Sequence, residues 1–537
     1  MNPSSLSELS VQNVSRYLVQ GYYKDEKRKL PQELSNEVFK MIYKRRRGLK
    51  KEERKQLDEG LKKILLPSKI FVYANCEADI SLIRNQTIEE LGFKFGTEIE
   101  DLGVKNGDDP PNKKPRTESR LVLIDIVSLL ANNLTPESQR LLKTLVLTSP
   151  QERGFPFASG WVQPMARLLP SLTTLKLYSR MIENDEFASI CENFPRLLVL
   201  DISRTKITSL KGISNIMYLG ELSIGSWYLE DIDEIYELKA LKNLRMRCGL
   251  NDSDMIDSLK SFINSDKSLV ALELFDCADS NINIESLKKI EARHPTLAEI
   301  IVTGNSLVGY FPNNPNIRVI SDDTFPACFN ALEYFEKNGY YNGIIYTLQT
   351  ISDKIDEPFE DLEKRWLQHL VRILYRMIPK HEGDVFIYLE IVNCCWDLAS
   401  KQVLELLDNE DKRVLIECFL RIIESSEIEE VRYVSQLWND MNEVIKTTQN
   451  RQTNRLISVA LKYFLLTDDV DINGPCLETI ECLLDKINLQ SDCYKNLDRE
   501  KLLTKLKNDQ PDFDNLPNSK EVIEKLIKLF ETKHQPL

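Results

Sequence analysis

The chain has 537 residues with 42% hydrophobic and 28% charged content, and this length is too great for one hydrophobic core. Its net charge of −13 disfavours general binding to nucleic-acid phosphates, and no apolar run approaches the roughly 18–20 residues of a membrane span, so neither a nucleic acid nor a membrane is an expected partner. Eleven scattered cysteines and four histidines form neither a disulfide framework nor paired zinc ligands, which predicts reduced thiols, no bound metal and an intracellular location, cytoplasmic and/or nuclear.

Residues 1–75 are predicted to form short, charged helices. The first helix begins after Ser4 or Ser5, either of which can cap it. Its stripe at helical spacing consists of Leu6, Leu9, Ser10, Val14 and Leu18. Pro31 suits the first turn of a second helix, whose apolar side consists of Leu34, Val38 and Ile42. Two helices of this size cannot build a core, so we expect them to dock on another surface.

Two basic clusters stand out against the acidic composition: residues 44–47 (KRRR) with the lysines at 50–51, and residues 113–116 (KKPR). Each matches a nuclear import signal, but short basic runs match by chance often. We favour a solvated helix face for the first cluster. The second lies in residues 105–118, where glycine, adjacent prolines and mixed charge predict a disordered loop.

An internal repeat begins near residue 120. Its unit is a leucine, two residues, an aliphatic residue, one residue and another apolar residue. The second positions of the units are Leu145, Leu175, Leu200, Leu222, Leu244, Leu272 and Ile300. Successive units start 30, 25, 22, 22, 28 and 28 residues apart, close to the spacing of leucine-rich repeats. Alternating apolar residues give each short strand one inward face, which is buried only when the next unit stacks on it. We therefore predict a leucine-rich-repeat α/β solenoid over residues 76–325.

The apolar period becomes helical after about residue 325. Amphipathic segments follow one another with short connections, which predicts an all-α solenoid of armadillo or HEAT type over residues 326–537. The fold class is therefore a mixed repeat protein with three parts.

No catalytic constellation accompanies these repeats. The sequence contains no GxxxxGK[ST], GxGxxG or GxSxG motif and no CxxC pair. The histidines at 294, 369, 381 and 534 are isolated from one another along the chain. We expect no catalytic residue, no cofactor and no enzymatic activity.

The N-terminal spacings resemble two known docking motifs. Ser5-Leu6 followed by Ser10 and Val14 resembles the elongin C-binding BC-box, with Ser10 in place of the usual cysteine. Leu30, Pro31, Leu34 and Val38 match the cullin-2 box. The two motifs in this order resemble a VHL box. The alternative is two ordinary helices that cap the first leucine repeat.

A VHL box followed by leucine-rich repeats and armadillo-like helices resembles the Zyg-eleven/Zer-one family over nearly the whole chain. The similarity extends to residues 331–336 (ALEYFE) and 344–348 (IIYTL). It implies a substrate receptor of a cullin-2–elongin BC ubiquitin ligase that recruits protein clients for proteasomal degradation. Elongin C (with elongin B) would bind Leu6, Ser10 and Val14, and cullin-2 would bind Leu30, Pro31, Leu34 and Val38.

The family reads N-terminal glycine degrons with a helix that the stretch at 437–443 (LWNDMNE) resembles. The resemblance implies that Trp438 forms a wall of the site and that Asn439 and Glu443 make polar contacts. Asn442 stands where the family has an aspartate, which leaves open whether this chain reads a glycine. The alternative for Trp438 is a core tryptophan between helices.

Three alternatives to the whole assignment stay open at this stage. The chain could be a repeat scaffold without a ligase, a nuclear transport or chromatin adaptor that uses the basic clusters, or an enzyme, for which the sequence offers no positive evidence. A homodimer is compatible with each of these functions. The sequence identifies no client.

Overall fold

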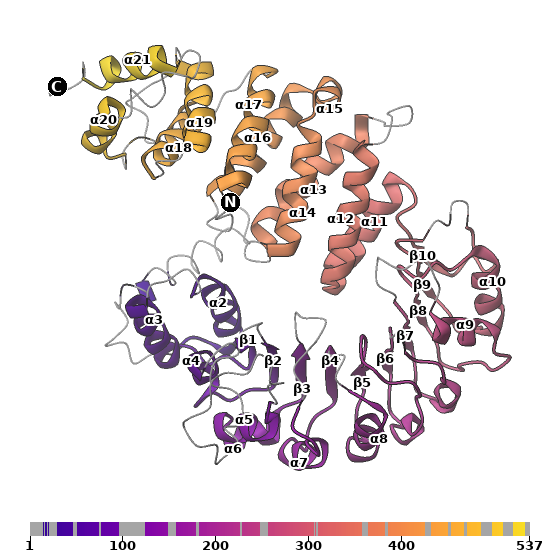
Figure 1. The fold of residues 1–537 in the computed structure, drawn as a ribbon. Coiled ribbons are helices and arrows are strands. Elements are labelled where there is room, and N and C mark those ends of the chain that lie inside the picture. The colour runs from indigo at the N-terminus through magenta and orange to yellow at the C-terminus, as the bar shows by residue number, and fades with distance from the viewer. Residues whose placement is uncertain are drawn as a thin grey trace, which may run out of the picture. The chain divides into compact units, whose positions relative to one another are not determined.

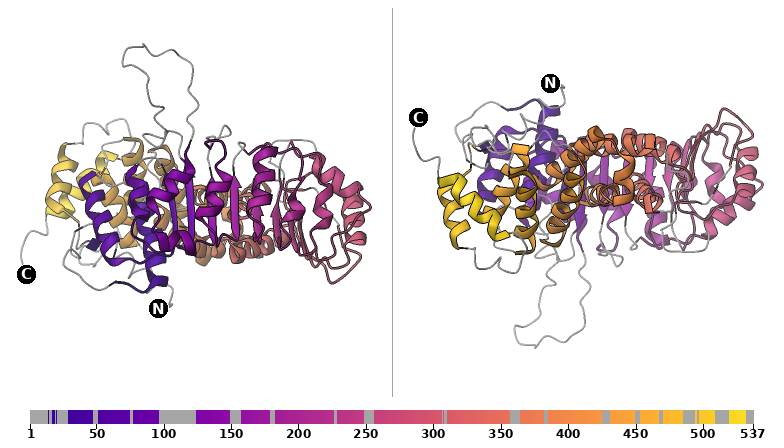
Figure 2. Two further views of the ribbon diagram at one scale, coloured as in Figure 1. Left: turned by 90° about the horizontal axis from the view of Figure 1, so that it is seen from below. Right: turned by 90° about the horizontal axis from the view of Figure 1, so that it is seen from above.

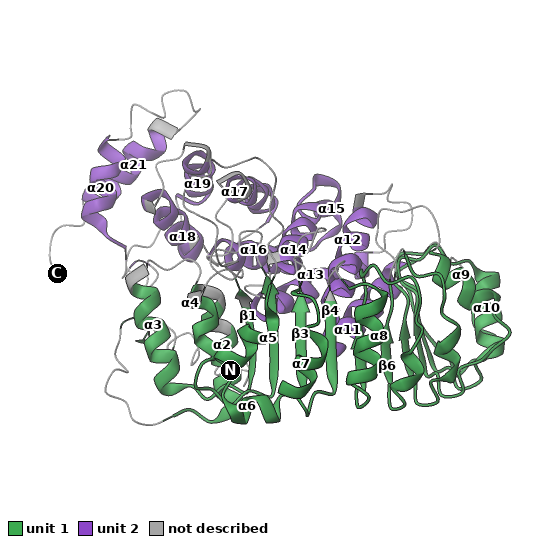
Figure 3. Ribbon diagram, turned by 60° about the horizontal axis from the view of Figure 1, so that its bottom comes forward, with its two compact units in different colours: residues 1–323 green, residues 324–537 purple. Residues whose placement is uncertain are grey.

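The computed structural model divides into two compact units, residues 1–323 and 324–537 (Figures 1 and 3). The described residues are 14, 17–18, 20, 29–46, 51–74, 77–95, 124–148, 157–178, 182–225, 228–247, 256–305, 307, 310–356, 364–381, 385–424, 431–448, 453–466, 470–484, 494, 497–508 and 519–531. The predicted loop at 105–118 and the basic cluster at 113–116 lie outside these residues. The second unit begins at Thr324, close to the predicted boundary between residues 325 and 326.

Unit 1 is built on a ten-stranded parallel sheet whose strands follow one another in chain order (Figure 2). The strands are β1 (Lys69–Ala74), β2 (Glu90–Phe95), β3 (Thr144–Thr148), β4 (Thr174–Tyr178), β5 (Val199–Asp201), β6 (Glu221–Ser223), β7 (Asn243–Arg245), β8 (Leu274–Asp276), β9 (Glu299–Ile301) and β10 (Arg318–Ile320). Parallel strands in unbroken sequence order are the arrangement of a leucine-rich-repeat solenoid. The predicted repeat architecture is therefore confirmed at this level.

Helices return the chain from one strand to the next on the outer side of this sheet (Figure 1). They are α4 (Glu77–Ile80), η2 (Ser81–Ile83), α5 (Ile126–Asn133), α6 (Pro136–Leu141), α7 (Val162–Leu168), α8 (Asn184–Asn193), η3 (Ile213–Asn215), η4 (Asp233–Glu237), α9 (Asp257–Asn264) and α10 (Ile284–Arg293). Two further helices, α2 (Gln32–Arg45) and α3 (Lys51–Ile64), precede β1. The leucines of the repeat lie fully buried between the sheet and the returning segments.

The register agrees with the repeat prediction in all but one unit. Leu200 of β5 pairs with Leu222 of β6, and Leu222 pairs with Leu244 of β7. Leu244 then pairs with Phe275, whereas the sequence pattern placed Leu272 at this position. The sequence 269–280 offers two alternations three residues apart, and the one containing Phe275 and Cys277 buries both side chains completely. The predicted register of this unit was wrong by three residues.

The sheet also begins earlier than predicted. β1 lies within residues 1–75, which were assigned to the docking helices, but it pairs along its whole length with β2. The repeat pattern missed both strands because the position three residues before the inward-facing Ile70 and Leu91 holds Pro67 and Ile88 instead of a leucine. Gly92 in β2 accommodates the ring of Phe71 from β1, since a Cβ at Gly92 would lie 2.0 Å from that ring. The solenoid therefore includes the segment that follows α3.

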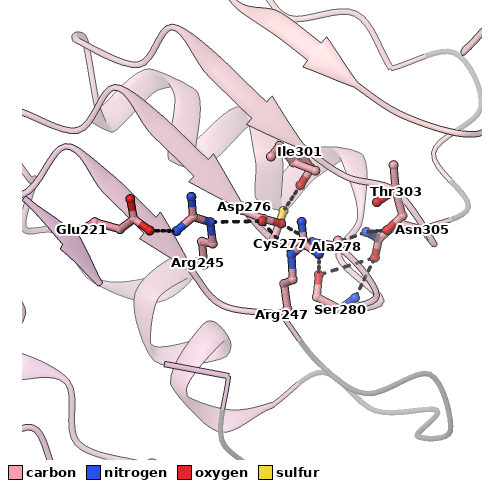
Figure 4. A network of polar contacts seen from close by, with 10 residues as sticks. All are labelled: Glu221, Arg245, Arg247, Asp276, Cys277, Ala278, Ser280, Ile301, Thr303 and Asn305. Atoms are coloured by element: carbon pink, nitrogen blue, oxygen red, sulfur yellow. Dashed lines mark hydrogen bonds and ion pairs between the residues drawn. The ribbon is translucent and has the colours of Figure 1, made fainter. Parts of the chain in front are cut away.

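Polar side chains close the turns at the ends of the strands (Figure 4). The fully enclosed Asn305 donates to the carbonyls of Cys277 and Val302 at 3.0 and 2.9 Å, and its Oδ1 accepts from the backbone N–H of Ser280 at 3.1 Å. Gly304, just before Asn305, has a left-handed φ of 74°. In the turn these backbone N–H and C=O groups have no partner on a neighbouring strand, and the Asn305 side chain supplies their hydrogen bonds instead. Asn305 thus joins consecutive repeats.

We expect the buried His294 to make unit 1 less stable in acid. Its ring is 1% exposed, stacks on Phe262, and accepts a hydrogen bond from the Leu269 N–H at Nδ1. Burial, with the nearby Arg293 charge, lowers the pKa of His294 from 6.5 to about 4. The neutral ring therefore contributes stability that is complete above pH 6.5 and is lost as the pH falls from 6.5 towards 4.

We expect the thermal midpoint of the wild type to fall over this pH range more steeply than that of His294→Gln. The variant is less stable at pH 7.5 because it packs less well, but it lacks the titrating ring. Thermal melts at pH 7.5, 5.5 and 4.5 compare the two slopes. Parallel slopes would show that His294 does not cause the acid sensitivity.

Unit 2 is a stack of helical hairpins. The first helices of the hairpins are α11 (Phe325–Asn338), α13 (Lys364–His381), α16 (Asn409–Glu424), α18 (Thr453–Leu466) and α20 (Arg499–Asn508). The second helices are α12 (Tyr341–Asp356), α14 (Val385–Leu398), α17 (Val431–Lys446), α19 (Val470–Leu483) and α21 (Ser519–Glu531). A short helix, α15 (Lys401–Leu406), precedes α16. The first helices begin 39, 45, 44 and 46 residues apart, which is the spacing of HEAT and armadillo repeats. Two helices per repeat correspond to the HEAT form of the predicted armadillo or HEAT solenoid.

Candidate functional site

The predicted elongin-binding residues are only partly within the described chain. Leu6 and Ser10 lie outside it. Val14 is helical and packs, partly buried, against the hydrophobic core of unit 1. Leu18, one turn further on, is 1% exposed and contacts Gly60 of α3 closely, because a Cβ at Gly60 would lie 2.8 Å from Leu18 Cδ2. The end of the first predicted helix is therefore anchored on α3.

The predicted cullin-binding residues separate into an exposed and a packed part. Pro31 is exposed and precedes the first residue of α2, with its carbonyl accepting from the Ser35 N–H at 2.8 Å. Leu30 and Leu34 are half-buried against the core, and Val38 is completely buried. The Leu30 N–H also donates to the Ile64 carbonyl of α3 at 2.9 Å. Val38 cannot contact a partner in this conformation, so its role in the structure is packing.

A buried ion-pair cluster holds this helical region together. Arg46 follows α2 directly, and its side chain is 4% exposed. Its guanidinium donates to both oxygens of Asp58 in α3 at 2.8 and 2.9 Å, and it also pairs with Asp79 in α4. Arg46 thus links three helices around the first strand. It belongs to the basic cluster at 44–47, so at least this member is structural and unavailable for import recognition.

Trp438, the first of the predicted degron-binding residues, lies in the helical core. It is fully buried in α17, with its ring edge-to-face against Tyr463 of α18 at 5.9 Å between centroids. The Tyr463 hydroxyl donates to the Ile423 carbonyl of α16. The structure therefore supports the core position for Trp438 rather than a wall open to a ligand.

Asn442, one turn after Trp438, is also fully buried. Its Nδ2 donates to the Pro475 carbonyl at 3.0 Å and to Glu478 Oε2 at 3.3 Å, and its Oδ1 accepts from Thr479 Oγ1 at 2.6 Å. An aspartate at this position could not donate to either oxygen, and its charge would be buried against Glu478. The contacts with α19 thus explain why an asparagine stands here.

Asn439 and Glu443 lie on an exposed side of α17 next to the buried one, four residues apart on one face. Glu443 pairs with Lys446 at 2.7 Å, and Lys446 also pairs with Glu478 of α19 at 2.9 Å. Asp440 lies beside this face, where burial raises its pKa to about 6 and the Glu443 charge adds to the effect. The four predicted residues therefore form two pairs: Trp438 and Asn442 inside, Asn439 and Glu443 outside.

Unit 1 contains a second polar network, which sequence reasoning missed because its residues are far apart in the chain (Figure 4). Asp276 of β8 is fully buried and accepts from Arg247 Nε at 2.6 Å, with Arg245 Nε at 3.7 Å. Arg245 also pairs with Glu221 of β6. Arg245 and Arg247 thus offset the charges of Glu221 and Asp276. Asp279, buried close to Arg247, Asp276 and Asp322, adds a further carboxyl, and its burial raises its pKa to about 7.

The described residues contain neither a candidate metal site nor a membrane-spanning helix. In that part of the chain, no group of three or more histidine, cysteine, aspartate or glutamate side chains has the geometry to hold a metal ion. No helix there is long and apolar enough to cross a membrane. The described thiols lie in the core, with Cys482 as the exposed exception.

The fold defines a leucine-rich-repeat protein with a C-terminal helical-repeat unit. No family model matches the chain. Gastrulation-defective protein 3 of Caenorhabditis elegans is 23% identical over 409 residues, which cover 74% of this chain and 54% of the nematode protein. This match supports the resemblance to the Zyg-eleven/Zer-one family that the sequence pattern predicts. The chain thus spans about half the length of the curated relative that it matches.

One solved structure, an internalin of Listeria monocytogenes, is 18% identical and covers 50% of this chain and 82% of its own. Its TM-score is 0.26, a value that carries no weight for the overall fold. The repeat architecture rests on the strands and helices described above.

Proposed function

We propose that the chain is a non-catalytic substrate receptor of a cullin-2–elongin BC ubiquitin ligase, working in the cytoplasm and/or nucleus. The observation that carries the proposal is the order of the motifs: docking spacings, then leucine repeats, then helical repeats. The similarity to the nematode protein supports it. Leu6, Ser10 and Val14 would contact elongin C, and Leu30 with the exposed Pro31 would bias the choice towards cullin-2.

Such a receptor acts by proximity. Holding a client lysine close to a ubiquitin-charged enzyme raises the effective concentration of the two reacting groups, so the receptor needs no catalytic residue of its own. The client site that we propose is the outer face of α17, with Asn439 and Glu443 contacting the N-terminal segment of a client. Trp438 and Asn442 would support this face from behind.

Co-purification tests the ligase assignment. We expect the tagged wild-type chain to bring down elongin C and the Leu6→Asp variant to lose at least about 90% of it, because a carboxylate in an apolar contact costs several kcal/mol. Immunoblotting of elongin C against an equal amount of chain measures the loss. Equal recovery by both proteins would refute the docking motif.

A repeat scaffold without a ligase is the second candidate, and the burial of Val38 is the observation that favours it. Leu34 and Val38 cap the first strand in the way that ordinary flanking helices would. A scaffold predicts no recovery of elongin C by the wild type, so the same co-purification distinguishes the two functions.

A further inference from the structure

Asp279 lies in the turn after β8, and one oxygen of its buried carboxyl group lacks a partner. The residue is 8% exposed, and its Oδ1 accepts no hydrogen bond from the described residues. Its backbone has a left-handed φ of 55°, while its N–H donates to the Thr303 carbonyl at 2.8 Å. A buried carboxylate needs hydrogen bonds or a cation to offset the loss of water, whereas a neutral carboxyl group loses much less. These surroundings therefore favour the protonated form of Asp279.

The Asp279 carboxyl group approaches the backbone of the next repeat at Gly304. A Cβ at Gly304 would lie 1.9 Å from Asp279 Oδ1, so only a glycine leaves room for this oxygen. The Gly304 N–H donates to both oxygens of Asp322, at 2.9 and 3.0 Å. Asp322 is 4% exposed and precedes Asp323, the last residue of unit 1. Two buried carboxyl groups thus lie beside one glycine near the end of the leucine-rich repeats.

The charges around Asp279 are mostly of its own sign. They belong to Arg247 after β7, Asp276 in β8 and Asp322 after β10, and residues 303–305 after β9 carry no charge. Arg247 Nε already donates to Asp276 at 2.6 Å (Figure 4). Burial, with the charges of Asp322 and Asp276, raises the pKa of Asp279 to about 7, although Arg247 opposes the rise. An ionised Asp279 therefore faces two carboxylates and a guanidinium that is already engaged.

We propose that Asp279 is a pH-sensitive switch in the turns that end the leucine-rich repeats. With its proton bound, the neutral carboxyl group packs beside Gly304 and the turns stay closed. When the proton leaves, the charge of Asp279 repels that of Asp322, and the turns open more often because the carboxylate is hydrated only in the open form. Acid thus tightens this end of unit 1. The sign is opposite to that of His294, whose protonation places a charge in the core.

Hydrogen exchange of the full chain at pH 5, 6, 7 and 8 tests the inference, which does not depend on the ligase assignment. Dividing each rate by the intrinsic rate at the same pH gives the opening constant of each segment. Asp279 binds its proton more strongly in the closed form, so raising the pH favours the open form until the closed form also ionises. We expect opening of residues 299–305 and 318–323 to increase by about tenfold per pH unit below pH 7 and to level off above it.

Two variants separate the charge of Asp279 from its packing. Asp279→Asn should abolish the pH dependence, because the amide is uncharged throughout the range. Asp322→Asn should move the levelling-off to lower pH, because it removes a like charge while its side-chain oxygen can still accept from the Gly304 N–H.

Asp201→Asn is the matched control. Asp201 of β5 is also a buried aspartate, at 5% exposure, but its Oδ1 accepts from the Ser203 N–H at 3.0 Å. Asp201→Asn should keep the wild-type profile in residues 299–305. Equal pH dependence in wild type and Asp279→Asn would overturn the inference, as would a wild-type opening constant that does not change with pH. If Asp279→Asn raises opening at every pH and keeps the wild-type slope, Asp279 only packs the turn and the inference fails.

Discussion

Replacing Arg46 by methionine is expected to destabilise the helices before the sheet by about 3–5 kcal/mol. The guanidinium is 4% exposed and pairs with Asp58 and Asp79, whose side chains are 16% and 10% exposed. Methionine preserves much of the side-chain volume but leaves two carboxylates without their cation. Hydrogen exchange of residues 29–46 and 51–64 measures the effect locally, which avoids assuming that the two units unfold together.

Lys40→Met is the control for this substitution, because Lys40 is an exposed residue of the same helix, α2. Lys40→Met should change the hydrogen-exchange rates of α2 and α3 little. Unchanged exchange in Arg46→Met would contradict the role of Arg46 as the link between α2, α3 and α4. If Leu6 binds elongin C and depends on these helices for its position, Arg46→Met should also recover less elongin C. The stability of the ion-pair cluster is then linked to the proposed function.

Trp438→Ala is expected to destabilise the α16–α19 region by about 3–5 kcal/mol, the usual cost of removing a large aromatic side chain from a core. The tryptophan is fully buried and touches Tyr463, so no neighbouring side chain can fill the space without moving a helix. Urea unfolding monitored by hydrogen exchange of α17 and α18 measures the change. If Trp438→Ala binds no peptide, the cause would be local unfolding of the helices and not the loss of a contact between the indole and the peptide.

Asn439→Ala separates the two explanations. Asn439 is exposed and adjacent to Trp438, so its replacement should change stability by less than about 0.5 kcal/mol. If Asn439→Ala loses peptide binding while keeping its protection from exchange, the outer face of α17 is the contact surface. Native-like stability of Trp438→Ala would instead show that the indole is not a core residue.

The repeat architecture of unit 1 could be predicted from sequence because each unit must bury the same face. Leu145, Leu175, Leu200, Leu222 and Leu244 occupy equivalent positions in neighbouring strands. The unit around Phe275 was placed three residues too early, since its leucines at 269, 272 and 274 fit the leucine pattern better than the alternation that the strand uses, which ends in Phe275 and Cys277. The pattern missed strands β1 and β2 because Pro67 and Ile88 stand where the later units have their first leucine.

The candidate site was less predictable, for a different reason. Spacing on one helix places Trp438 and Asn442 on one side of α17 and Asn439 and Glu443 on another, but it does not say which side α19 covers. That side is settled by contacts with Pro475 and Thr479, more than 30 residues away. Lys446 went unnoticed because its second partner, Glu478, lies in the next repeat. The same holds for Arg46, whose partners come from α3 and α4.

The most direct test of the proposed function is assembly from purified components. The full chain is mixed with elongin B, elongin C and cullin-2 and analysed by size-exclusion chromatography, alongside the Leu6→Asp variant. We predict that the wild type co-elutes with all three proteins and that Leu6→Asp elutes apart from them. Separate elution of the wild-type chain from both elongin C and cullin-2 would contradict the assignment as a ligase receptor.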